Sequence, residues 1–164
     1  MREAAGALLA ASDTIDMCAA ETLTFDAEPK EVERIDAWIE TTGRRWGASQ
    51  KTIFGARLCV AELFANAIEH AGAKSGHDRI IVTLARRGEG LGHEGLGHQG
   101  LGIEFLDTCA PFDPTAFAIA ERPDSIDAIA ANGRGLMLIR AYAREFAYRH
   151  DGTYNRVTLV IAPR

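Results

Sequence analysis

The sequence predicts an α+β domain in which short strands, joined as hairpins, accompany three helices. Residues 79–85 and 103–106 are short segments rich in apolar or β-branched side chains, as strands are. Near the C-terminus, 145–149 and 155–162 have the same character and flank an Asp-Gly dipeptide at 151–152, which favours a tight turn. Each pair is therefore expected to form an antiparallel hairpin.

Three further segments carry apolar residues at helical spacing, namely 30–42, 49–70 and 133–142. Gly43 and Gly72 follow the first two, at positions where glycine commonly ends a helix. The sequence therefore places three helices between the strands.

An additional strand is expected at 21–25, and the alanine-rich residues 1–20 form an N-terminal extension that favours a helix. The domain proper is therefore expected to span residues 21–164.

A glycine-rich repeat of five residues fills 88–102 between the first two predicted strands. A unit of five residues is too short to form a packed repeat, so a flexible hairpin connection is expected there. His93 and His98 within it leave metal binding open as an alternative. Residues 111–132, interrupted by prolines, are long for a simple connection and are typical of a lid.

Composition restricts the classes of function. The 164 residues include 18 Lys or Arg and 23 Asp or Glu, which gives a net charge of −5. An acidic balance argues against direct nucleic-acid or membrane partners, because both need a surplus of basic side chains. The absence of a signal-like or membrane-spanning stretch, together with three widely spaced cysteines, predicts a cytoplasmic protein without disulfides.

Glu62 and Asn66 lie four residues apart, so a helix places them one turn from each other on the same face. A carboxylate can act as a base, and a carboxamide oxygen suits a hard cation such as Mg²⁺. Taken alone, the pair is also what two solvated polar residues would look like.

Two downstream features strengthen the interpretation. Asp107 ends a predicted strand, where a carboxylate can accept a hydrogen bond from the exocyclic amine of a base. Gly133 and Gly135 flank Arg134 at the start of a helix, where backbone amides can approach a phosphate. The three elements in this order point to a nucleotide site more strongly than any one of them.

The segment 62–71 resembles the N box of the histidine-kinase-like ATPases, 107–113 their first glycine box, and 133–136 their second. The resemblance covers about residues 21–162 and is greatest to the anti-sigma-factor serine/threonine protein kinases of bacterial partner-switching systems. It implies a two-layer α/β sandwich, known as the Bergerat or GHKL fold. A mixed, mainly antiparallel sheet would be covered on one face by three helices.

The resemblance also implies roles for individual residues in binding ATP and Mg²⁺. Asn66 would coordinate Mg²⁺, and Glu62 would be the general base that activates a serine hydroxyl. Asp107 would bind the adenine amine.

The other implied roles concern the phosphates and the base. Gly133 and Gly135 would offer backbone amides to the phosphates, with Arg134 adding positive charge, and Asn155 would support the adenine. The sequence departs from the family pattern at Cys109, where the first glycine box usually has glycine.

The implied function is that of an ATP-binding serine protein kinase and anti-sigma factor. Its partners would be a sigma factor and a STAS-type antagonist that it phosphorylates, and relatives often form homodimers. The alternative is a catalytically weak or inactive nucleotide-sensing module that acts by protein binding alone. The catalytic domain of a histidine kinase is less favoured, because residues 1–20 contain no histidine to accept a phosphoryl group.

Overall fold

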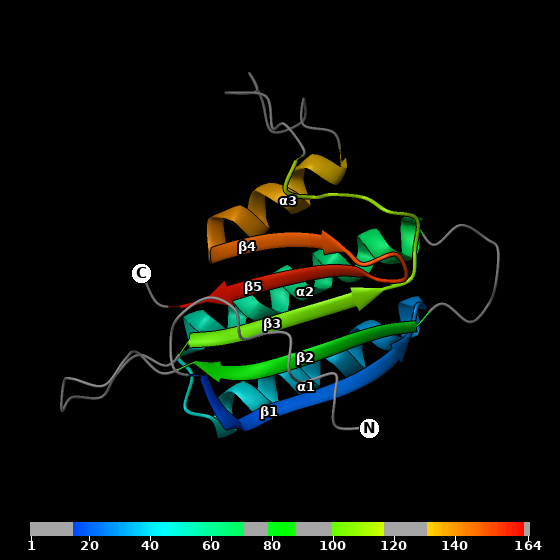
Figure 1. Ribbon diagram of the computed structural model, residues 1–164. Helices are drawn as coiled ribbons and strands as arrows, with labels where there is room; N and C mark the ends of the chain where they lie inside the picture. The colour runs from blue at the N-terminus through cyan, green and yellow to red at the C-terminus, as the bar shows by residue number, and fades with distance from the viewer. Residues whose placement is uncertain (1–14, 71–78, 88–99, 117–130, 163–164) are drawn as a thin grey trace.

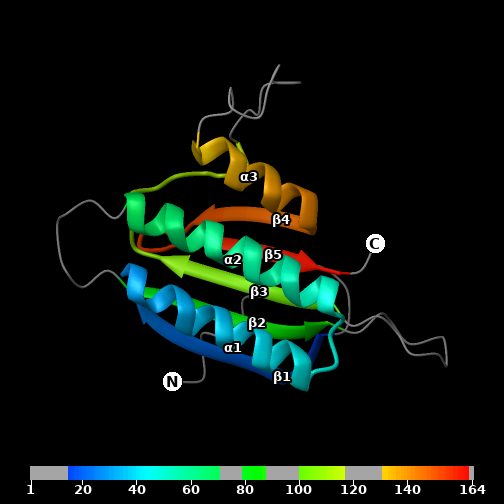
Figure 2. The same cartoon turned by 180° about the vertical axis from the view of Figure 1, so that it is seen from behind.

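The computed structural model describes residues 15–70, 79–87, 100–116 and 131–162, which form two layers (Figure 1). One layer is a sheet of five strands: β1 (Ile15–Asp26), β2 (Arg79–Arg87), β3 (Gly100–Asp107), β4 (Ala143–His150) and β5 (Asn155–Ile161). The other contains α1 (Val32–Arg45), α2 (Gln50–His70) and α3 (Ala131–Tyr142), with a short 3-10 turn η2 (Pro29–Glu31) before α1. All three helices cover the same face of the sheet (Figure 2).

The strand order is β1-β2-β3-β5-β4, and every pair of neighbours is antiparallel. This confirms the predicted α+β sandwich and both predicted hairpins, and it makes the described sheet antiparallel throughout rather than mixed. β3 occupies the centre and is buried along its whole length. Its last residue, Asp107, therefore emerges at the edge of the core beneath α2.

The prediction of a helix over residues 1–20 is wrong for its last six residues, which belong to β1. The segment 20–26 pairs residue by residue with 79–85 of β2. Pairing with a neighbouring strand outweighs the helix propensity of the local sequence. Residues 1–14 lie outside the described part of the chain.

The glycine-rich segment also differs from the expectation at its C-terminal end. β3 begins at Gly100 instead of residue 103, because Gly100 pairs with Arg87 of β2 and Leu101 pairs with Ile161 of β5. Residues 88–99, with both histidines, and 117–130 of the expected lid lie outside the described residues. No helix among the described residues is long and apolar enough to cross a lipid bilayer.

Three phenylalanines hold α2 over the sheet. Phe64 of α2 makes edge contacts with Phe25 of β1, at a centroid distance of 6.3 Å, and with Phe105 of β3, at 6.5 Å. All three are essentially fully buried. Because Asn66 lies two residues beyond Phe64, this contact fixes the polar face of α2 relative to the end of β3.

The turns at the helix and hairpin ends follow their sequence signals. Ser49 caps α2, because its Oγ accepts the backbone N–H of Thr52 at 3.1 Å. The β4–β5 turn has Gly152 at φ +93°, and Oδ1 of Asp151 accepts two backbone N–H groups at 3.0 and 2.8 Å. Both features confirm the predicted helix start and hairpin.

The predicted end of the first helix at Gly43 is wrong, since α1 continues to Arg45. The helix ends instead with Gly47 at φ +74°, where Gly47 N–H donates to Arg44 and Ala48 N–H donates to Gly43. A Cβ on Gly43 would lie 2.8 Å from Cγ1 of Ile53 in α2. Gly43 is therefore required for the close approach of the two helices.

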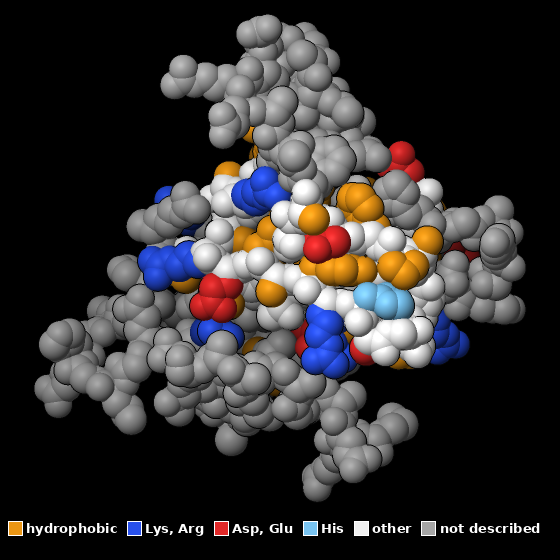
Figure 3. Space-filling model, turned by 45° about the horizontal axis from the view of Figure 1, so that its top comes forward, with side chains coloured by type: hydrophobic (Ala, Val, Ile, Leu, Met, Phe, Trp, Pro, Cys, Tyr) orange, Lys and Arg blue, Asp and Glu red, His pale blue; other side chains and the backbone are white. Residues whose placement is uncertain are grey.

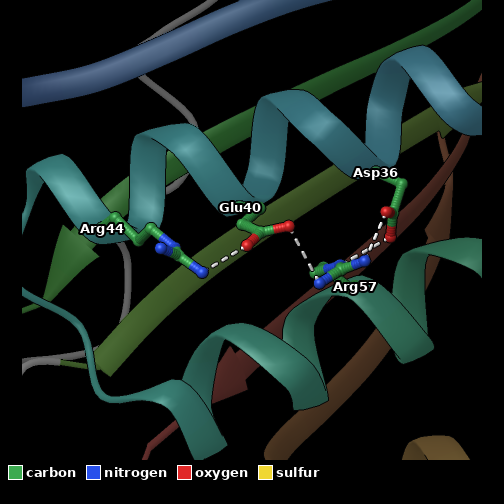
Figure 4. Close-up of polar contacts among 4 residues, drawn as sticks. All are labelled: Asp36, Glu40, Arg44 and Arg57. Carbon is green, nitrogen blue, oxygen red and sulfur yellow. Dashed lines mark hydrogen bonds and ion pairs between the residues drawn. The ribbon is translucent and has the colours of Figure 1, made fainter.

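Ion pairs join α1 and α2 on their outer side (Figure 4). Arg57 of α2 donates to both oxygens of Asp36, at 2.7 and 2.5 Å, and lies 3.1 Å from Glu40. Arg44 extends the cluster with a hydrogen bond of 2.6 Å to Glu40. This bidentate geometry supplements the apolar contact at Gly43 and sets the spacing of the two helices.

Substitution of Gly43 by alanine tests the helix packing. An exposed glycine inside a helix would gain about 1 kcal/mol from this change. Because Ile53 is buried and cannot move away freely, we expect a net loss of about 1–2 kcal/mol in the free energy of unfolding. Urea denaturation measures the change, with Thr41→Ala on the exposed side of α1 as the control. Stabilisation by Gly43→Ala would show that the helices do not approach this closely.

Candidate functional site

A pocket opens where β3 ends, between α2 and the C-terminal half of the sheet. Its walls are mainly apolar, with polar side chains on α2 and on the sheet. They are formed by Leu63, Asn66, Ala67, Phe105, Asp107, Cys109, Ala110, Phe112, Pro114, Tyr148, Asn155 and Val157. The structure thus brings together three predicted site residues, Asn66, Asp107 and Asn155, which are far apart in the sequence.

Asp107 is the buried acid of the pocket, with 8% of its surface exposed. Its Oδ1 accepts Nδ2 of Asn155 at 2.8 Å and the backbone N–H of Cys109 at 2.9 Å. The residues are adjacent because Asp107 and Asn155 are partners in the β3–β5 register. Within the described part of the chain, Oδ2 of Asp107 accepts no hydrogen bond, so it can bind a donor from outside the protein.

Asn155 also closes the segment that follows β3. Its Nδ2 lies 3.0 Å from the carbonyl oxygen of Cys109 and 3.3 Å from that of Ala110. The hydroxyl of Tyr148 donates to Oδ1 of Asn155 at 2.7 Å. With 4% of its surface exposed, Asn155 has both ends of its amide paired, as a buried carboxamide requires.

Cys109, which replaces the family's usual glycine, is half-buried at the pocket wall. Its thiol donates a hydrogen bond to the backbone oxygen of Ala67 in α2, with a sulfur–oxygen distance of 3.3 Å. The side chain is therefore directed at α2, and the pocket keeps its acid and its apolar walls despite the added sulfur.

Glu62 lies one turn of α2 before Asn66, and its carboxylate lies against α3. A Cβ on Gly135 would be 3.1 Å from the carboxyl carbon of Glu62 and closer still to Oε2. Glu62 does not line the pocket itself, whereas Asn66 does. Gly135 therefore leaves the space that the Glu62 carboxylate occupies.

The start of α3 differs from the prediction by two residues, since the helix begins at Ala131. Gly133 falls in the first turn, where backbone N–H groups lack partners within the helix. Gly135 is the fifth residue, so its N–H belongs to the regular helix. Gly135 therefore leaves space for Glu62, and the N–H of Gly133 has no partner within the helix. The side chain of Arg134 lies outside the described atoms.

The first residues of the expected lid, 111–116, are held to the domain by polar contacts. Oδ1 of Asp113 accepts the hydroxyl and the backbone N–H of Thr115, at 2.6 and 2.8 Å. These hydrogen bonds hold the pKa of the Asp113 carboxyl below its ordinary value, and the one from the Thr115 hydroxyl has the largest effect. Arg140 of α3 donates to the backbone oxygen of Thr115 at 2.9 Å, which links this segment to α3.

Among the described residues, no three His, Cys, Asp or Glu side chains gather as a metal site. Mg²⁺ commonly keeps several waters and binds phosphates with only one or two protein ligands. The donor set on α2, an amide oxygen beside a carboxylate one turn away, fits that pattern.

Tyr148 and the backbone of residues 109–110 were missed by motif reasoning. A signal existed, however, because the turn at 151–152 fixes the register in which His150 pairs with Asn155 and Tyr148 pairs with Val157. The side chain of Tyr148 is then on the same face as Asn155, within diagonal reach.

The surface turned toward the viewer in Figure 3 carries both acidic and basic side chains. Among the described side chains on this face, acidic groups lie singly between hydrophobic and basic ones (Figure 3). The overall charge of −5 does not therefore form one continuous acidic surface on this side.

The fold and the pocket define a two-layer α+β domain with a buried acid between its layers. The chain belongs to the histidine kinase-like ATPase family, whose domain model matches residues 25–161. The match includes α2, the end of β3, α3 and β5, and so covers every residue that lines the pocket, together with Glu62, Gly133 and Gly135.

A solved structure shares the fold. The crystal structure of the RsbU and RsbW domains of Rv1364c from Mycobacterium tuberculosis superimposes with a TM-score of 0.56 and 16% sequence identity. The likeness covers 88% of this chain but only 33% of that one, so this chain spans about a third of its length. No curated protein matches the sequence.

The two described thiols should differ sharply in reactivity. Burial, with a smaller contribution from Glu62, raises the pKa of the Cys59 thiol to about 12. Because alkylation requires the thiolate, Cys59 should stay unlabelled by iodoacetamide at pH 8 in the folded protein. Cys109, half-buried at the pocket wall, should be labelled at least tenfold faster.

Peptide mass spectrometry measures the two rates separately, and urea-unfolded protein serves as the control in which both should react alike. Equal rates in the folded protein would contradict the burial of Cys59.

Proposed function

We propose that this chain binds ATP and transfers its γ-phosphoryl group to a serine of a partner protein, as an anti-sigma factor of a partner-switching system. The partners would be a sigma factor and a STAS-type antagonist, the latter being phosphorylated. The observation that carries the proposal is the pocket that Asp107 and Asn66 line, with Glu62 one turn of α2 before Asn66 and outside the pocket wall. Membership of the ATPase family and the fold shared with an RsbW domain support it.

The base would occupy the apolar part of the pocket. Leu63, Phe105 and Val157 offer apolar contact, and Oδ2 of Asp107 would accept the exocyclic amine of adenine. Asn155 would hold Asp107 in place and would not touch the base directly.

The phosphates would lie toward α3. Asn66 would contribute its amide oxygen to Mg²⁺, which when bound neutralises phosphate charge and orients the reacting group. Gly133 would offer its N–H at the positive end of α3, and Arg134 would add a positive charge.

Glu62 would remove the proton from the attacking hydroxyl. The serine oxygen forms a bond to the γ-phosphorus while the bond from that phosphorus to the bridging oxygen of the departing ADP breaks. The Glu62 carboxylate takes the serine proton, so charge and atoms balance. Its place against Gly135 would hold it in one position and reduce the cost of orienting it.

Substitution of Glu62 by glutamine tests the base. Glutamine keeps the shape but cannot accept the proton, so we expect serine phosphorylation to fall at least about 100-fold while ATP affinity stays within about threefold. Radiolabelled ATP with candidate antagonist proteins measures transfer, and calorimetry measures binding. Glu69→Gln, on an exposed position of the same helix, is the matched control. Unchanged transfer in Glu62→Gln would remove Glu62 from this role.

Gly135→Ala tests the space beside the carboxylate. The new Cβ displaces the end of a flexible side chain, so the fold should survive with little change in stability. We expect a loss of phosphorylation of about tenfold or more because Glu62 is misplaced.

The same change made in the Glu62→Gln background should cause no further loss, since the two residues act as a unit. Equal losses in both backgrounds would show that Gly135 acts independently of Glu62.

The second candidate function is a nucleotide-sensing or purely protein-binding module without kinase activity. The observation that favours it is Cys109 at the pocket wall in place of glycine. Titration with ATP, with and without Mg²⁺, separates the candidates. Binding together with protection of Cys109 from alkylation supports a nucleotide site there, and the absence of binding at millimolar ATP would favour the protein-binding module.

A further inference from the structure

We propose that Tyr148 is a positioning residue that sets the preference of the pocket for adenine, by holding Asn155 and, through it, Asp107. This role rests on the proposed nucleotide site. Tyr148 comes from β4, outside the three motifs that carry the family resemblance, and nothing in those motifs anticipates it.

The contacts form a directed chain of donors and acceptors. The Tyr148 hydroxyl donates to Oδ1 of Asn155 at 2.7 Å, and Nδ2 of Asn155 donates to Oδ1 of Asp107 at 2.8 Å. Because an amide oxygen can only accept, the single hydrogen of the phenol is directed at Asn155.

The hydroxyl remains a donor at all physiological pH values. Burial raises the pKa of Tyr148 above its ordinary value of 10, and the carboxylates of Asp113 and Asp107 act in the same direction. The Phe112 N–H acts in the opposite sense without reversing the shift. Tyr148 therefore supplies a constant hydrogen bond and does not act as a pH switch.

The consequence for base selection follows from the Asp107 carboxylate. With Oδ1 occupied by two N–H donors, Oδ2 offers only an acceptor to the pocket. An amino group at the 6-position of a purine satisfies that acceptor, whereas a carbonyl at the same position faces it with a second acceptor. Adenine is therefore favoured over hypoxanthine for as long as the carboxylate is held in this orientation.

Removal of the Tyr148 hydroxyl should disturb the Asp107 carboxylate indirectly, through Asn155. In Tyr148→Phe, the buried Oδ1 of Asn155 loses its donor, and an unpaired buried carbonyl is costly. The amide can regain a partner only by moving, which releases Asp107. Selectivity should then fall because the acceptor is no longer fixed.

The experiment compares ATP with inosine triphosphate, which carries a carbonyl at the 6-position. Calorimetric titration of the full chain gives the selectivity ratio, defined as the dissociation constant of inosine triphosphate divided by that of ATP. The ratio is measured for the unaltered protein, Tyr148→Phe, Asn155→Ala and the double variant. Tyr148→Phe should lower the ratio at least about fivefold, as expected for one hydrogen bond. In the Asn155→Ala background it should change the ratio less than twofold. Tyr142→Phe, which packs on Phe54 away from the pocket, is the matched control.

A merely structural role for Tyr148 would weaken both nucleotides equally and leave the ratio unchanged, which would overturn the proposal. An equal effect of Tyr148→Phe with and without Asn155 would also overturn it. If Asn155→Ala does not fold, Asn155→Leu, which keeps the size of the side chain but has no hydrogen-bonding group, takes its place with the same expected result. An unaltered chain that binds no ATP would overturn the proposed function and this role together, whereas normal ATP binding with an unchanged ratio overturns only the role of Tyr148.

Discussion

The hydrogen bond between Asp107 and Asn155 is the contact on which the pocket depends. A carboxylate that is 8% exposed is costly to bury unless donors surround it, and Asn155 and the Cys109 N–H supply them. Satisfying Asp107 forces the chain after β3 to turn back over the pocket, where Asn155 also holds the carbonyls of residues 109 and 110. One buried charge thereby shapes the strand end, the following segment and the wall of the site.

The sheet register explains how this contact arises. Asp151 and Gly152 set the β4–β5 turn, which makes Asn155 the first residue of β5, opposite His150 on one side and Asp107 on the other. A slip of one residue would turn Asn155 to the opposite face and leave the acid without its donor. The turn thus affects the site although it lies outside it, and the Phe25–Phe64–Phe105 contact then places α2 above the same point.

Sequence reasoning succeeded where the controlling signal was local. The hairpin turn, the Ser49 cap and the polar face of α2 follow from neighbouring residues, and the structure brings Asn66, Asp107 and Asn155 into one pocket. It failed where a distant partner decides. Gly43 continues a helix because Ile53 packs there, and residues 15–20 form a strand because β2 pairs with β1. The contact of Gly135 with Glu62 likewise needs two helices in place, which no motif specifies.

The overall charge of −5 poses a problem for the proposed binding of a polyanion, which a local arrangement of charges would have to solve. In the proposed complex, Asp107 would lie at the base end of the pocket, where its negative charge would meet an amine and stay away from the phosphates. At the other end, the first turn of α3 has backbone N–H groups without partners within the helix, and Asn66 would offer a neutral ligand in place of a second carboxylate. Glu62, the remaining acid near the proposed phosphate end, lies against Gly135 and outside the pocket wall. Placing the acid at the end of β3 and the phosphate contacts toward α3 is what would allow an acidic chain to bind ATP in a pocket with no Lys or Arg among its described lining residues.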